Sequence, residues 1–317
     1  MCHVAISQIT APRWGLSREL DRLVAHGFSS LAMWRPKASD TPPAAAAAAL
    51  RASGVRPSSL HGTGGFTGSD GRSFAESVAD AVEAIEAAAS MAADSPAPPV
   101  VVLHSGCRGG HTRGHARRLL LDALGQLAPI ARREGVVLGL QPLRAAAAAG
   151  CSFLTTLGEA LDVVETHADP AVGLAVDLWH FGDDPETVAL LPRLAPATVL
   201  LQAADRSGPP SVASDRLPVG HGTLPLESLA ASLAAHGYRG VVEFDPVGET
   251  VEVLGYEGVL REARIVADAW AARIERLVAD GTAVRHEMEH AVGWPAHFRR
   301  GGAGGSRRSQ ASSQAVS

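Results

Sequence analysis

Short β-rich runs of apolar residues alternate with Ala- and Leu-rich segments of helical length, and this alternation repeats about eight times along the chain. It is typical of βα units, in which each helix leads to the next strand of a parallel sheet. The expected strands are His3–Ile9, Ser30–Trp34, Val55–His61, Val100–His104, Val136–Gln141, Val172–Asp177, Thr198–Ala203 and Gly240–Phe244. The expected helices are Leu16–Ala25, Pro43–Ala52, Ser73–Ala92, Gly114–Arg133, Leu157–His167, Pro185–Leu194, Leu226–Ala235 and Glu257–Val278.

The number of βα units favours a closed barrel over an open sheet. Eight strands and eight helices in about 280 residues match the size of a closed (β/α)8 TIM barrel. A doubly wound open sheet is the alternative, but no Gly-x-Gly-x-x-Gly motif follows the first strand. We therefore expect a single (β/α)8 TIM barrel over residues 1–279.

The end of the chain differs in composition from the rest. The apolar periodicity fades from about Asp280, and Arg300–Gln310 consists mainly of Gly, Ser and Arg. Such a composition cannot bury a core, so residues 280–317 are expected to form a flexible low-complexity tail. Residues His286–His290 match the His-Glu-x-x-His zinc pattern. They lie next to this tail without a packed cleft, and we interpret the match as coincidental.

Charge and composition exclude several functional classes. The net charge is −5, which argues against nucleic acid as the main partner. No run of about 18 uncharged apolar residues is present, so no membrane span is expected. The chain shows no secretory signal, which leaves a cytoplasmic location as the expectation. Its three cysteines are too few and too scattered for a disulfide framework.

Polar residues stand at the ends of several expected strands. In a closed barrel the carboxyl ends of the strands surround one pocket, where active sites lie. A cluster of carboxylates and imidazoles there is a candidate metal or acid/base site. The residues at these positions are His61, His104, Gln141, Asp177, His180, Gln202, Asp205 and Glu243.

Four local motifs add a resemblance that covers nearly the whole predicted barrel. They are Asp177-x-x-His180, Gln202-x-x-Asp205, the Gly-x-Gly run within Pro218–Leu226, and the strand sequence Gly237–Glu243. With these motifs the chain resembles the xylose isomerase-like TIM-barrel superfamily. This superfamily includes sugar phosphate isomerases and epimerases and repair enzymes of the AP endonuclease family 2 (endonuclease IV) type.

The resemblance implies a divalent metal site with acid/base catalysis. In that family a Glu, an Asp, a His and a Glu on strands five to eight usually hold the ion, which implies Gln141, Asp177, Gln202 and Glu243 here. Two glutamines replace the usual Glu and His, so Mn²⁺, Mg²⁺ or Zn²⁺ would be held more weakly. An amide cannot act as a general base either. The implied scheme has Glu243 as the single base, with His180, His104 or His61 as general acid.

Three functions are compatible with this pattern. The leading one is a sugar, ketose or polyol isomerase, epimerase or related lyase, with Glu243 and His180 catalytic. The second is a degenerate barrel that binds a sugar-like ligand without turnover. The third, an endonuclease suggested by His61 and His104, is disfavoured by the acidic charge. The residues expected to bind substrate are His61, His104, Asp205, Arg206 and His221. The expected partner is a small sugar or polyol, and a homo-oligomer is left open.

The segment Gly62–Gly71 is rich in glycine. Two interpretations stay open for it. Its backbone N–H groups could cradle a phosphate, or the segment could be a flexible loop over the mouth of the barrel.

Overall fold

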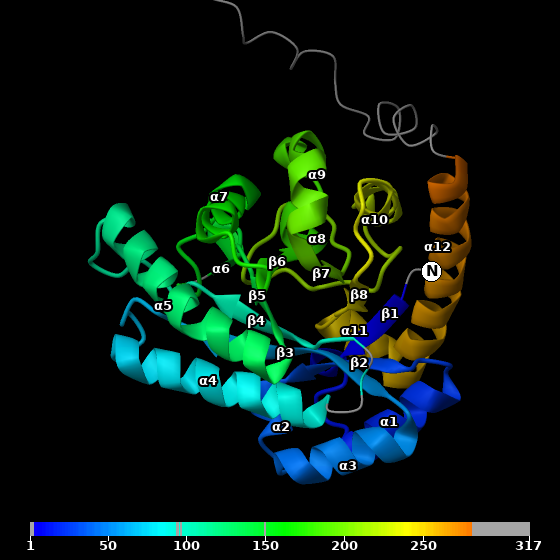
Figure 1. The fold of residues 1–317 in the computed structure, drawn as a ribbon. Helices are drawn as coiled ribbons and strands as arrows, with labels where there is room; N and C mark the ends of the chain where they lie inside the picture. Colours follow the sequence, from blue (N-terminus) through cyan, green and yellow to red (C-terminus); the bar gives the residue numbers. More distant parts are fainter. Residues whose placement is uncertain (1–2, 93–94, 96, 149, 281–317) are drawn as a thin grey trace, which may run out of the picture.

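The computed structural model describes residues 3–92, 95, 97–148 and 150–280. Its eight parallel strands pair in chain order, and β8 closes the barrel on β1 (Figure 1). The predicted TIM barrel is therefore confirmed. The strands are β1 His3–Ser7, β2 Ser30–Trp34, β3 Arg56–Gly64, β4 Val100–His104, β5 Val137–Leu140, β6 Val172–Asp177, β7 Thr198–Ala203 and β8 Val241–Phe244. The predicted tail, residues 281–317 with the His286–His290 motif, lies outside the described residues.

The long helices form the outer layer (Figure 1). They are α1 Leu16–Ala25, α3 Pro43–Ser53, α4 Phe74–Met91, α5 Arg113–Glu134, α7 Leu157–His167, α9 Pro185–Ala197, α10 Leu226–Ala235 and α12 Tyr256–Asp280. Short helical segments follow the strands: η1 Gln8–Thr10, α2 Arg35–Ala38, α6 Ala145–Ala148, α8 Leu178–Phe181 and α11 Glu249–Leu254. No helix in the described part of the chain is long and apolar enough to cross a membrane.

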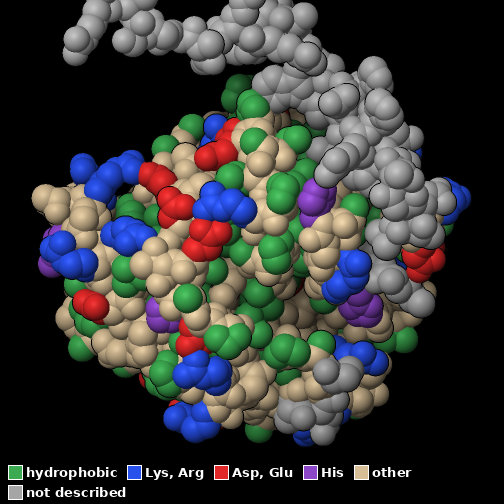
Figure 2. Space-filling model, turned by 45° about the horizontal axis from the view of Figure 1, so that its top comes forward, with side chains coloured by type: hydrophobic (Ala, Val, Ile, Leu, Met, Phe, Trp, Pro, Cys, Tyr) green, Lys and Arg blue, Asp and Glu red, His purple; other side chains and the backbone are tan. Residues whose placement is uncertain are grey.

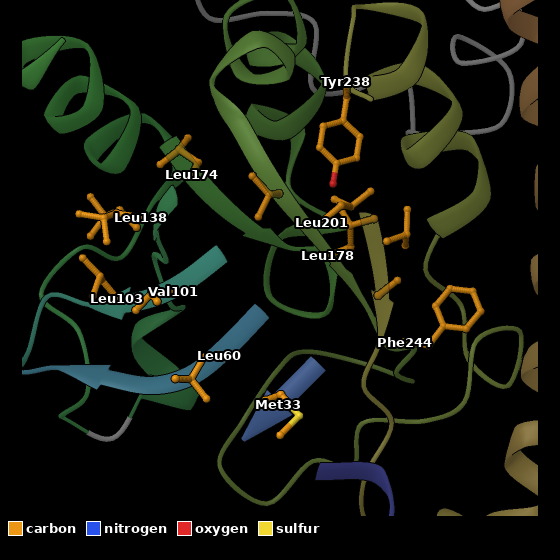
Figure 3. Close-up of a cluster of buried hydrophobic side chains, with 14 of the residues drawn as sticks. Met33, Leu60, Val101, Leu103, Leu138, Leu174, Leu178, Leu201, Tyr238 and Phe244 are labelled. Atoms are coloured by element: carbon orange, nitrogen blue, oxygen red, sulfur yellow. The ribbon is translucent and has the colours of Figure 1, made fainter. Parts of the chain in front are cut away.

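Alternate side chains of each strand divide into two hydrophobic layers. Side chains on the outer face belong to one large hydrophobic cluster that also contains residues of the helices, and Figure 3 shows Leu60, Leu103, Leu138, Leu174 and Phe244 of this cluster. A small separate cluster fills the barrel interior and consists of Val100, Val102, Ala175 and Leu200. The polar residues at the strand ends lie two positions after these interior residues, as His104 does after Val102. They therefore lie on the same side of the strand, and their side chains point into the mouth of the barrel.

Two strand ends differ from the prediction by more than one residue. The first strand ends at Ser7 instead of Ile9, because Ser7 begins a 3₁₀ turn and its Oγ accepts the N–H of Ile9. The third strand continues to Gly64, beyond the predicted end at His61. Gly62 and Gly64 both have positive φ, and this lets the backbone stay paired with β4 across a register shift.

The surface carries charges of both signs. On the face shown in Figure 2, Lys and Arg side chains lie interspersed with Asp and Glu and with apolar side chains. Such mixing is usual for the surface of a globular domain.

Replacing Ser73 by alanine should lower the free energy of unfolding by about 1 kcal/mol. Ser73 Oγ accepts the N–H of Glu76 at 3.2 Å, and Glu76 Oε2 accepts the N–H of Ser73 at 2.7 Å, so the pair forms a capping box at the start of α4. Urea unfolding followed by circular dichroism measures the loss. The control Glu76→Gln keeps an acceptor at its position and should cost less. Equal losses would contradict this account.

Candidate functional site

The strand-end residues predicted from the sequence meet in the mouth of the barrel. Asp177, Gln202 and Glu243 are register partners on β6, β7 and β8, and their side chains are almost completely buried. His61 at β3 and His104 at β4 are half-buried at the same mouth. Neighbouring hydrogen bonds join these residues into two connected groups.

The first group surrounds Glu243, whose carboxylate is fully buried. Its Oε1 accepts the hydroxyl of Ser58 at 2.7 Å and that of Ser59, while its Oε2 lies 2.9 Å from His61 Nε2. Burial alone would lower the pKa of His61, but the charges of Glu243, Asp245 and Asp177 raise it above its ordinary value. The side chain of His61 is 14% exposed, so the imidazole lies between Glu243 and the mouth.

The second group is a chain of hydrogen bonds across the strand ends. His104 Nε2 lies 2.7 Å from Gln141 Oε1, Gln141 Nε2 donates to Gln202 Oε1 at 2.6 Å, and Gln202 Nε2 donates to Asp245 Oδ2 at 3.1 Å. An ionised Asp245 can only accept, and this fixes the orientation of both amides. His104 must therefore donate from Nε2, as a neutral imidazole does in one tautomer. Burial lowers the pKa of His104 and favours this neutral form.

Arg216 joins the end of this chain to Asp177. Its Nη1 and Nη2 donate to the two carboxylate oxygens of Asp177 at 3.0 and 3.1 Å, and its Nη2 donates to Asp245 Oδ2 at 2.5 Å. The guanidinium also lies over the ring of Trp179, 5.0 Å from the centroid. Backbone bridges hold this part of the loop after β7, since Arg216 pairs with Val247.

The titratable residues of this cluster differ in the direction of their pKa shifts. Burial would raise the pKa of Asp177, but Arg216 and His180 lower it, so this carboxylate stays ionised. Burial, followed by the charge of Asp177, raises the pKa of Asp245 to about 6 against the effect of Arg216. Burial lowers the pKa of His180 to about 4, which makes this imidazole neutral. His180 Nε2 lies 3.7 Å from Asp177 Oδ2, and its buried Nδ1 has no hydrogen-bond partner among the described residues.

The donor set does not fit the divalent metal that the resemblance implies. Among the residues that the structure describes, no group of three or more His, Cys, Asp and Glu side chains could hold a metal ion. The oxygens of Gln141 and Gln202 both already accept a hydrogen bond, and the carboxylates of Asp177 and Asp245 bind Arg216. Glu243, the fourth predicted ligand, faces Ser58, Ser59 and His61 instead.

Three predicted substrate-binding residues make structural contacts. The Asp205 carboxylate accepts the backbone N–H groups of Arg206, Gly220 and Leu224 at 2.9, 3.1 and 3.0 Å, which orders the loop before α10. Arg206 donates to the carbonyl of Trp179 and to the carboxylate of Asp183. His221 Nε2 lies 2.8 Å from Glu262 on α12. Their role in substrate binding stays a prediction.

The structure adds residues that the sequence reasoning did not select. Asp245 lies two positions after Glu243, so the period of two along a strand was an available signal. Ser58 and Ser59 precede His61 on β3 but are too common a residue type to stand out. Arg216 lies in an irregular loop, and no periodicity connects it with Asp177.

Comparisons with known proteins agree with this architecture. Residues 20–269 match the family model described as xylose isomerase-like TIM barrel. No curated protein sequence matches the chain. A solved structure of a protein from Sinorhizobium meliloti is 26% identical, with a TM-score of 0.73 over 83% of this chain and 96% of that one.

Two further solved structures share the fold at lower identity. The IolI protein, crystallised with a zinc atom, is 17% identical, with a TM-score of 0.70 over 89% of this chain and 99% of that one. An L-ribulose 3-epimerase is 16% identical, with a TM-score of 0.71 over 89% of this chain and 99% of that one. These likenesses concern the barrel as a whole.

Proposed function

The chain belongs to the xylose isomerase-like TIM-barrel family, as its motifs predicted, and from this premise we propose that it isomerises a small sugar or polyol-derived carbonyl compound. The observation that carries this proposal is the His61–Glu243 pair, with 2.9 Å between His61 Nε2 and Glu243 Oε2 at the mouth of the barrel. The L-ribulose 3-epimerase among the structural neighbours supports a sugar as the substrate class.

The geometry assigns different roles to the two residues. Glu243 is fully buried behind His61, so it is a positioning residue in this proposal rather than the base that the sequence suggested. By accepting the Nε2 proton, Glu243 leaves the lone pair on His61 Nδ1, which is the nitrogen free to take a proton from substrate. This is the arrangement by which a carboxylate orients a catalytic imidazole.

The proposed reaction moves one proton on one face of the substrate. His61 Nδ1 removes a proton from the carbon next to the carbonyl, and the C–H electron pair forms the C=C bond of an enediol as the carbonyl oxygen takes a proton from a water molecule. The other hydroxyl of the enediol then gives its proton to the resulting hydroxide and becomes the new carbonyl. The C=C electron pair takes a proton from His61, whose Nδ1 proton exchanges with solvent, at the neighbouring carbon. Because Gln141 cannot act as a base, this one-face transfer favours isomerisation over an epimerisation that needs a base on each face.

Exchange of substrate hydrogen with solvent tests this proposal. Aldoses and ketoses incubated with the purified protein in D2O should gain deuterium next to the carbonyl, as followed by NMR. His61→Asn should slow this exchange by about 100-fold or more, because the base is gone. Glu243→Gln should also slow it, with kcat falling more than KM rises. The matched control is His26→Asn, which removes an imidazole paired with Glu257 of α12, and it should exchange like the wild type.

A binding protein without turnover is the second candidate. The specific observation in its favour concerns two of the four metal-ligand positions of the family. The amides of Gln141 and Gln202, which are hydrogen-bonded to each other, stand where the family usually has a Glu and a His. Saturable binding of a sugar by calorimetry, together with no deuterium uptake by the wild type, would select this candidate. Uptake that His61→Asn leaves unchanged would contradict the proposed isomerase mechanism.

A further inference from the structure

We propose that Arg216 is a built-in cation that takes the position of a divalent metal between Asp177 and Asp245, so that the site does not use a metal ion. This proposal concerns how the pocket is assembled. It does not depend on which reaction the protein catalyses.

The hydrogen bonds place the guanidinium between the two carboxylates. Arg216 contacts both oxygens of Asp177 at 3.0 and 3.1 Å and one oxygen of Asp245 at 2.5 Å. Its Nε donates to the backbone carbonyl of Asp245 at 3.3 Å. Four of the five guanidinium N–H groups are thereby used, and Trp179 packs against the guanidinium plane. These contacts fix the guanidinium of Arg216 between Asp177 and Asp245.

The two neutral amides of the site, Gln141 and Gln202, form hydrogen bonds that keep Asp245 beside Arg216. Gln202 donates to Asp245, and the oxygen of Gln202 accepts from Gln141. A metal that used both amide oxygens would have to break these bonds and displace Arg216. A metal that bound with Arg216 still in place would instead add two positive charges to a buried cluster in which Arg216 already offsets one of the two carboxylates. Without further anionic ligands, such a site binds hard cations poorly.

Within the described part of the chain, the fifth guanidinium N–H group of Arg216 is the one hydrogen-bond donor that Arg216 has left for a ligand. One N–H of Nη1 is left after the contacts with Asp177 and Asp245. A single donor suits one carbonyl or alkoxide oxygen, whereas a metal ion can bind two neighbouring oxygens of a sugar at once. If the proposed isomerase function holds, this N–H would stabilise the oxygen of the enediol.

Metal binding tests the proposal directly, with Mn²⁺ as the probe. After treatment with EDTA, the full-length protein should show no stoichiometric Mn²⁺ binding by calorimetry, and Mn²⁺ should not shift its thermal midpoint. Zn²⁺ is a poorer probe because His286 and His290, spaced like zinc ligands, could bind it independently. Stoichiometric Mn²⁺ binding by the wild type would overturn the proposal, and this measurement needs no variant to fold.

A matched pair of variants isolates the contribution of Arg216. Gln141→Glu with Gln202→His restores the missing ligand types but keeps Arg216, and Arg216→Met added to this pair removes the cation. The triple variant should bind Mn²⁺ about 100-fold or more tightly than the double variant. Equal binding by the two, or no binding by a folded triple variant, would show that Arg216 does not occupy the metal position.

Discussion

Replacing Arg216 by methionine should lower the free energy of unfolding by about 3–5 kcal/mol. The substitution leaves Asp177 and Asp245 buried close together without their shared cation. The cost arises because an unpaired buried charge loses its hydration without compensation. Guanidinium unfolding followed by circular dichroism measures the difference.

The pH dependence of this loss follows from the two carboxylates. The pKa of Asp245 is already raised to about 6 in the folded protein, and removal of Arg216 would raise it further. A carboxyl whose folded pKa exceeds its unfolded pKa of about 4 stabilises the fold while protonated, and this contribution is lost as the pH rises. The deficit of Arg216→Met should therefore be larger at pH 8 than at pH 5.

Two controls separate charge pairing from lost packing. Asp245→Asn added to Arg216→Met removes one of the two unpaired charges and should recover part of the stability. Arg264→Met removes an arginine from a surface ion pair with Asp268 and should change the stability by less than about 1 kcal/mol. A loss at Arg216 as small as that at Arg264 would contradict the account of the buried cluster.

The fold could be predicted from the sequence because hydrophobic periodicity is a local signal. Strands such as Ser30–Trp34 and Val172–Asp177 were predicted with their observed bounds, since each apolar run ends at a polar or turn residue. The end of β3 was missed because glycines usually terminate strands. Here the positive φ values of Gly62 and Gly64 allow the pairing with β4 to continue.

The candidate site was predictable only where strands position its residues. His104, Asp177 and Gln202 follow directly from the strand ends, since closure of the barrel brings these ends together. Arg216 depends on the course of an irregular loop, which is set by tertiary contacts such as the bridge to Val247. The contact of Glu243 with His61 depends on side-chain rotamers and on a register shift of β3, and neither leaves a pattern in the sequence.

Replacing Gly64 by alanine should destabilise the protein by about 3 kcal/mol or more. An added Cβ would overlap the backbone carbonyl of His104, which is part of β4 and cannot move aside as a flexible side chain could. The same carbonyl accepts the N–H of Gly65 at 3.1 Å. Relief of the overlap would push β3 and β4 apart and move His104 away from Gln141, so the variant should lose both stability and ligand binding.

The control for this variant is Gly71→Ala in the same glycine-rich segment. Gly71 has a φ of +88°, but a Cβ there would meet no atom within 4 Å. Its substitution should therefore cost only the backbone strain, about 1 kcal/mol. The difference between the two variants in guanidinium unfolding measures the steric overlap at β4. If Gly64→Ala cost no more than Gly71→Ala, the close approach of β3 to His104 would not be a constraint on the site.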